Sequence, residues 1–146
     1  MWLTVAGNAE LDQRWCPMPP TAVAPEVPTI VLEPSERAPS LARRFVAEWF
    51  REWGIADDSD ARVVVSELVT NSLVHGDGPI VVRVLRDERD GRPVIEAWDG
   101  GEGRPAIQPE DHAATSGRGL LMVSQLAVEW GTRPLLEGGK LTWAKC

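Results

Sequence analysis

The sequence predicts an α+β fold: a two-layer α/β sandwich whose mostly antiparallel sheet carries its helices on one face. Two observations support this prediction. Apolar residues recur at strand or helix spacing in the order β-α-α-β-β-α-β-β, and successive strands are joined by short glycine turns, which favour antiparallel neighbours. The 146 residues, 43% hydrophobic and 25% charged, are enough for one soluble domain with a single core.

The first 28 residues differ in composition from the rest of the chain. They show little apolar periodicity and contain five prolines: Pro17, Pro19, Pro20, Pro25 and Pro28. We therefore predict a loosely ordered leader over residues 1–28 and a folded domain over residues 29–146.

The folded domain begins with a short strand over residues 29–33, which Pro34 closes. Ser35 is placed to cap the helix that follows, and Gly54 ends that helix. Its apolar residues recur at spacings of three and four: Leu41, Phe45, Val46, Trp49 and Phe50. The remaining predicted elements are a helix over 61–75, strands over 80–86 and 93–98, a polar loop over 99–116, a helix over 117–127, and strands over 128–132 and 140–145.

The bulk properties limit the function classes. A formal net charge of −7 argues against direct nucleic-acid binding, which requires a basic face. No apolar run approaches the ~20 residues of a membrane span, and the N-terminus lacks the pattern of a secretory signal. Cys16 and Cys146 are interpreted as unrelated thiols, with a terminal staple or metal pair as the alternative. We therefore expect a cytoplasmic protein.

A polar stripe runs along the predicted helix over residues 61–75. Glu67, Asn71 and His75 are spaced i, i+4, i+8, so they share one side of the helix. Their neighbours on that stripe are valines: Val63, Val64 and Val74. Burying such polar groups unpaired is expensive, so the stripe indicates a cavity with a polar ligand. The alternative is a helix edge whose three polar side chains hydrogen-bond to one another. The predicted core stripe of this helix is Ala61, Val65, Leu68, Val69 and Ser72.

A glycine-rich segment follows the strand over residues 93–98. It contains Asp99, Gly101 and Gly103. Glycines at a strand end let the backbone approach a ring or a phosphate closely, and a lone acid there can accept a hydrogen bond from an amine such as that of adenine. The alternative is a glycine-rich turn with a solvated aspartate.

A second glycine-rich segment begins the last predicted helix with Gly117, Arg118, Gly119 and Leu120. Free N–H groups and the helix dipole at such a start attract an anion, and Arg118 would add a charge-assisted contact to phosphate. The alternative is a flexible loop closed by glycines. Residues 138–140 are not a phosphate loop, because the upstream glycine and the following Ser or Thr are missing.

These three segments, in this order, resemble the ATP-binding boxes of the superfamily that includes gyrase, Hsp90, histidine kinases and MutL. Residues 67–75 (ELVTNSLVH) resemble its N box, residues 99–103 (DGGEG) its first glycine box and residues 117–120 (GRGL) its second. The small size, the short lid over residues 104–115 and the ending GGKLTW are similar to those of the anti-sigma-factor serine kinase branch. The resemblance implies a histidine-kinase-like ATPase fold over residues 29–146.

The resemblance also implies a Mg-ATP site. Asn71 would bind Mg²⁺ through its side-chain oxygen. Glu67 would be the general base that takes the proton from a serine hydroxyl as it attacks the γ-phosphate. The second glycine box would close over the phosphates: Gly117, Arg118, Gly119 and Leu120.

At the adenine end, the resemblance implies that Asp99 accepts a hydrogen bond from the amino group while Gly101 and Gly103 pass beside the base. The superfamily usually has a threonine two residues before the aromatic residue of the last strand. Here that position is Leu141, and strand alternation predicts that Thr142 points to the opposite face. We therefore expect that the site binds adenine more weakly, or that other residues support Asp99.

By resemblance, the protein is expected to be a serine/threonine protein kinase that phosphorylates a small antagonist protein, binds a sigma factor and forms a homodimer. One alternative remains: a non-catalytic module that holds ATP and sequesters a protein partner. Glu67 discriminates between the two only weakly, because it is necessary for proton removal but does not prove it.

Overall fold

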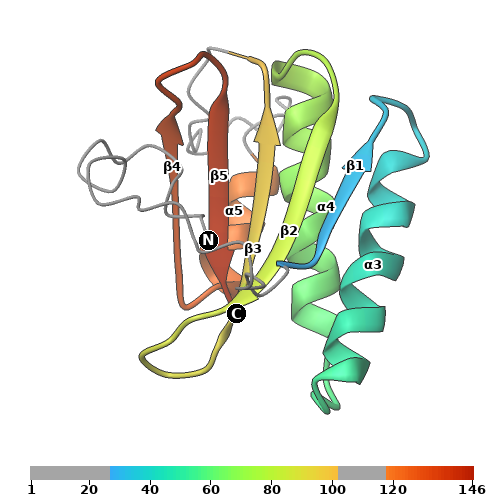
Figure 1. Cartoon of the computed structure of the whole chain (residues 1–146), viewed down its shortest axis with the longest axis vertical. Coiled ribbons are helices and arrows are strands. Elements are labelled where there is room, and N and C mark those ends of the chain that lie inside the picture. Colours follow the sequence, from blue (N-terminus) through green and yellow to red (C-terminus); the bar gives the residue numbers. More distant parts are fainter. Residues whose placement is uncertain (1–26, 102–117) are drawn as a thin grey trace, which may run out of the picture.

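The computed structural model of the chain describes residues 27–101 and 118–146. Within them, the elements follow the predicted order: β1 (Thr29–Leu32), α3 (Ala38–Glu52), α4 (Ser59–His75), β2 (Ile80–Arg86), β3 (Pro93–Asp99), α5 (Arg118–Leu126), β4 (Glu129–Pro134) and β5 (Lys140–Lys145). The strands form one antiparallel sheet in the order β1-β2-β3-β5-β4. The helices lie together on one face of it, behind the sheet in Figure 1. The predicted α+β sandwich is therefore confirmed.

Some of the predicted features lie outside the described residues. These are residues 1–26 of the predicted leader, and Gly103 and Gly117 of the two glycine-rich segments. Of Arg118, the structure describes the backbone but not the side chain. Within residues 27–101 and 118–146, no helix is long and apolar enough to cross a membrane.

The start of α3 differs from the prediction. The backbone oxygen of Ser35 accepts a hydrogen bond from the Ala38 N–H (3.0 Å), and its Oγ accepts one from the Arg37 N–H (3.3 Å). Ser35 therefore shapes the turn before the helix and does not cap it, while Arg37 holds the cap position without a side-chain hydrogen bond. The helix still begins favourably, because Pro39 lies in its first turn, where a backbone N–H is not needed.

The core lies between the sheet and the helices. The predicted core stripe of α4 is buried throughout: Ala61, Val65, Leu68, Val69 and Ser72. The sheet contributes the residues whose side chains point to the same layer: Ile80, Val82, Val84, Ile95, Ala97 and Ala144. Because α4 packs in the middle of this layer, against both α3 and α5, it fixes where the other two helices lie.

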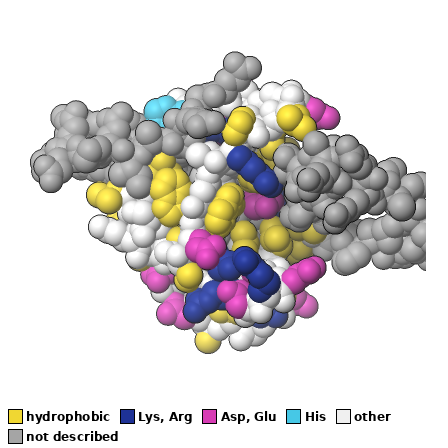
Figure 2. All heavy atoms as spheres, turned by 90° about the vertical axis from the view of Figure 1, so that its left-hand side faces the viewer, with side chains coloured by type: hydrophobic (Ala, Val, Ile, Leu, Met, Phe, Trp, Pro, Cys, Tyr) yellow, Lys and Arg dark blue, Asp and Glu magenta, His cyan; other side chains and the backbone are white. Residues whose placement is uncertain are grey.

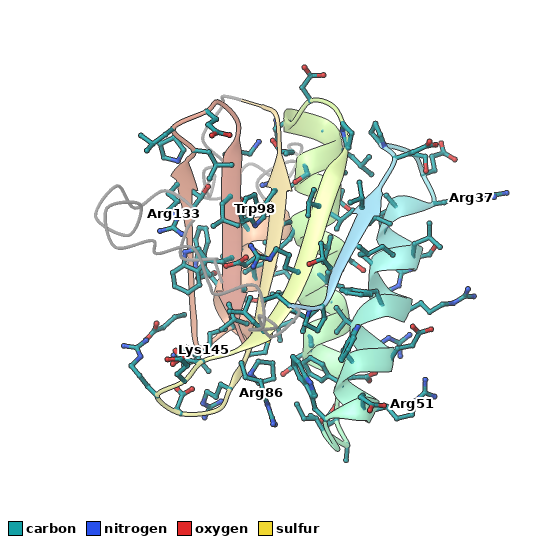
Figure 3. All side chains as sticks on the ribbon, in the orientation of Figure 1. Arg37, Arg51, Arg86, Trp98, Arg133 and Lys145 are labelled. Carbon is teal, nitrogen blue, oxygen red and sulfur yellow. The ribbon has the colours of Figure 1, made fainter. Side chains whose placement is uncertain are left out.

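Ion pairs join the β2–β3 hairpin to the end of β5. Lys145 Nζ lies 2.6 Å from Asp87 Oδ2 and 3.2 Å from Asp90 Oδ2, and Arg89 Nη2 lies 3.0 Å from Asp87 Oδ2. Hydrogen bonds from Arg89 and then from Lys145 hold the pKa of Asp87 well below its ordinary value. Basic and acidic side chains lie side by side at the lower end of the molecule (Figure 2), where Figure 3 labels Lys145.

Leu68 is fully buried at the centre of the α4 core stripe. We expect Leu68→Ala to lower the free energy of unfolding by roughly 2–5 kcal/mol, because the lost contacts leave a cavity. Urea denaturation measures this change. Leu136→Ala, at a side chain 76% exposed, is the control and should change stability by less than about 0.5 kcal/mol. Equal losses in the two variants would contradict the assignment of the core.

Candidate functional site

Helix α4 carries the phosphate end of the predicted site. Asn71 is buried, with 7% of its surface exposed, and Glu67 is half-buried one turn earlier. No hydrogen bond joins Glu67, Asn71 and His75 in the described part of the chain. The alternative of a helix edge paired with itself is therefore not what the fold contains. His75 is exposed at the last residue of the helix.

The valines predicted to line this stripe do not all do so. Val64 is fully buried in the core, whereas Val63 is 37% exposed and Val74 is 62% exposed. The helical period places Val63 and Val74 further round α4, on the side turned away from the sheet. The prediction of a valine-lined cavity is thus wrong for these two residues.

Gly119 brings helix α5 against Glu67. A methyl group at Gly119 would lie 2.5 Å from Glu67 Oε2, the far end of a flexible side chain, so the carboxylate would have to move for any larger residue there. Burial by the surrounding protein raises the pKa of Glu67 above its ordinary value of 4.5. A carboxylate with a raised pKa is a stronger base. Leu120, the next residue of the predicted site, is buried, with 1% of its surface exposed.

Asp99 forms the other end of the site and is also buried. Its Oδ1 accepts two hydrogen bonds, from the Gly101 N–H (2.8 Å) and from Lys140 Nζ (3.1 Å). Its Oδ2 is buried and has no hydrogen-bond partner among the residues that the structure describes. An unpaired buried oxygen costs about 1–3 kcal/mol, so this atom fits a hydrogen-bond donor from a ligand.

Three glycines make room for Asp99. A methyl group at Gly76 would lie 2.6 Å from Asp99 Cγ, and one at Gly101 would lie 3.1 Å from Asp99 Oδ1. Gly139 has a φ of +85°, and a methyl group there would collide with the Asp99 backbone oxygen. The end of α4 and the start of β5 can therefore both pack closely against Asp99.

Helix α4 thus spans the two ends of the site. Gly76, beside Asp99, follows Glu67 by nine residues, which corresponds to about 13 Å along a helix axis. One end offers an unpaired acceptor, and the other offers a carboxylate and an amide next to the start of α5. This arrangement suits an elongated ligand with a hydrogen-bond donor at one end and an anionic group at the other.

The sheet register corrects the predicted orientation of Thr142. Thr142 pairs with Ala97, and Lys140 pairs with Asp99, so Thr142 and Asp99 point to the same face, towards the helices. Leu141 pairs with both Trp98 and Arg133 on the opposite face, and Figure 3 labels these two residues. Counting alternation along β5 alone cannot show this, because it does not tell which residue of β3 each one faces.

Lys140 is the site residue that the sequence reasoning missed, together with Gly76 and Gly139. Its segment is not a phosphate loop, and the pattern of β5 does not indicate a ligand. The signal is the pairing of Lys140 with Asp99 across the two strands, which becomes visible only when the sheet is assembled. The expectation of a weaker or differently held adenine end stays a prediction, but its premise is wrong, because Lys140 and Thr142 lie on the face of Asp99 and Leu141 does not.

Comparison with known families identifies the domain. The profile of the histidine kinase-like ATPase domain matches residues 32–143. The chain belongs to this family. The match spans the three segments of the predicted site, and a histidine kinase-like ATPase domain implies ATP binding. A search of curated proteins finds no match.

The two ends of this ATPase site should respond differently to added methyl groups. Gly76→Ala would place Cβ against the Ser72 backbone oxygen and Asp99, so we expect the free energy of unfolding to fall by roughly 1–3 kcal/mol. Gly119→Ala meets only the flexible end of Glu67 and gains helix propensity, so stability should stay the same or rise by up to about 1 kcal/mol. Thermal or urea denaturation distinguishes them, and the opposite ranking would contradict the described geometry.

Proposed function

We propose that this protein is a serine/threonine protein kinase of the anti-sigma-factor type. It would phosphorylate a serine of a small antagonist protein and bind a sigma factor. The observation that carries the proposal is Glu67: a half-buried carboxylate with a raised pKa, one turn before Asn71 and in contact with the first turn of α5. The resemblance of its segment to the N box of that kinase branch supports the same role.

In the proposed reaction, the serine hydroxyl oxygen attacks the γ-phosphorus of ATP and ADP leaves. Glu67 takes the proton of that hydroxyl, so that the attacking oxygen is a better nucleophile. Asn71 would hold Mg²⁺, which neutralises charge on the phosphates, and the N–H groups at the start of α5 would face the same charge. Asp99 would accept from the amino group of adenine at the far end of α4.

The proposed partners follow from the same resemblance. A net charge of −7 would favour the encounter with a basic surface of a sigma factor. We further propose that the protein acts in the cytoplasm and forms a homodimer.

The second candidate is a non-catalytic module that holds ATP and sequesters a protein partner. The contact between Glu67 and Gly119 favours it, because a carboxylate whose role is to pack against α5 need not reach a substrate hydroxyl. The two candidates therefore differ in what Glu67 does.

Phosphoryl transfer tests the role of Glu67. Purified protein with γ-labelled ATP and cell extract should label a small protein, and Glu67→Gln should slow this labelling roughly 10²–10⁴-fold while ATP affinity stays close to wild type. The wild-type rate should fall as the pH decreases through the raised pKa of Glu67, because the protonated carboxyl cannot accept the proton.

Glu48→Gln, at an exposed residue of α3, is the control for this experiment and should label at the wild-type rate. ATP binding without a labelled product under any condition would favour the non-catalytic module. Labelling by Glu67→Gln at the wild-type rate would remove Glu67 from the mechanism.

A variant of Asn71 tests the phosphate end of the site independently of phosphoryl transfer. We expect Asn71→Ala to lose Mg-ATP binding by calorimetry while it keeps the fold, because Asn71 would provide the Mg²⁺ ligand. Circular dichroism checks the fold. Unchanged Mg-ATP affinity would contradict the assignment of Asn71.

A further inference from the structure

Lys140 is a deeply buried cation at the adenine end of the site. Its side chain is 3% exposed and that of Asp99 is 1% exposed, with Nζ 3.1 Å from Asp99 Oδ1. A buried charge is costly unless it is paired. The two residues are direct partners in the register of β3 and β5, so the sheet itself holds the ion pair in place.

The ion pair makes the two oxygens of Asp99 unequal. Lys140 Nζ and the Gly101 N–H both donate to Oδ1, which fixes the rotation of the carboxylate. Oδ2 is left buried and without a partner among the described residues. A single free acceptor suits the exocyclic amine of adenine. Guanine carries a carbonyl oxygen, itself an acceptor, at the corresponding position.

We propose that Lys140 is a positioning residue that sets the selectivity of the site for the adenine amino group. By holding Oδ1, Lys140 directs Oδ2 of Asp99 to that amine. This inference deepens the proposed function, since it rests on ATP binding at the same site, but it does not require phosphoryl transfer.

A purely structural ion pair is the competing explanation, and the chain offers a matched control for it. Lys145 lies on the same strand with a side chain 6% exposed, and it pairs with Asp87 and Asp90. Its register partner is Val94, so it points to the other face of the sheet from Lys140. Lys140→Met and Lys145→Met each remove a paired lysine from β5, but only the first removes a contact to Asp99.

The experiment measures affinities by calorimetry for ATP and for purine riboside triphosphate, which lacks the amino group. We expect wild type to prefer ATP. Lys140→Met should lower ATP affinity about tenfold or more, the loss typical of a hydrogen bond to a charged group that is no longer aligned. Affinity for the purine analogue should change little, so the preference for the amine should largely disappear. Lys145→Met should retain the wild-type preference.

The outcomes separate this inference from the ATP site itself. A folded Lys140→Met variant with the wild-type ratio of the two affinities would overturn the role of Lys140 and leave ATP binding standing. Wild-type protein that binds neither nucleotide would overturn both. If Lys140→Met does not fold, Lys140→Gln, which keeps a polar side chain without the charge, replaces it in the same measurement. A wild-type ratio in that variant would also overturn the inference.

Discussion

The buried carboxylate of Asp99 is the constraint on which the site depends. It lies at the end of β3, accepts a hydrogen bond from Lys140 of β5, and is approached by Gly76 at the end of α4. Sheet and helix can close on it only because the surrounding positions are glycines, since a side chain at Gly76 would occupy the same space. The ion pair with Lys140 offsets part of the cost of burial. The remaining oxygen, Oδ2, has no hydrogen-bond partner among the described residues.

The phosphate end depends on the packing of α5 against α4. Gly119 lets the first turn of α5 approach Glu67, which places helix N–H groups and a carboxylate side by side. Glu67 is partly buried there, and this burial raises its pKa above the ordinary value. A change in the packing between these two helices would therefore alter both the geometry of the phosphate end and the basicity of its carboxylate.

Most of the fold could be predicted from the sequence, whereas the contacts around Asp99 in the candidate site could not. The order of elements, the β2–β3 hairpin and the core stripe of α4 follow from periods of 2 and 3.6 residues, which a single segment displays. Glu67 and Asn71 were predicted in the same way, from their spacing on one helix, and both lie on α4. Ser35 does not cap α3, because its Oγ and its backbone oxygen accept hydrogen bonds within the turn that precedes the helix. Val63 and Val74 are exposed, contrary to the prediction. The helical period shows which residues share a side of α4, but it does not show how far the neighbouring helix covers that side.

The sequence by itself determined the order of the elements, the superfamily and the side of α4 that Glu67 and Asn71 share, because these rest on periods and motifs within short segments of the chain. The tertiary structure alone decided that Lys140 faces Asp99 and that Thr142 points towards the helices. Lys140 and Asp99 are 41 residues apart, and the register between two strands depends on the packing of the whole sheet against its helices. The orientation of the free Asp99 oxygen is set by that register.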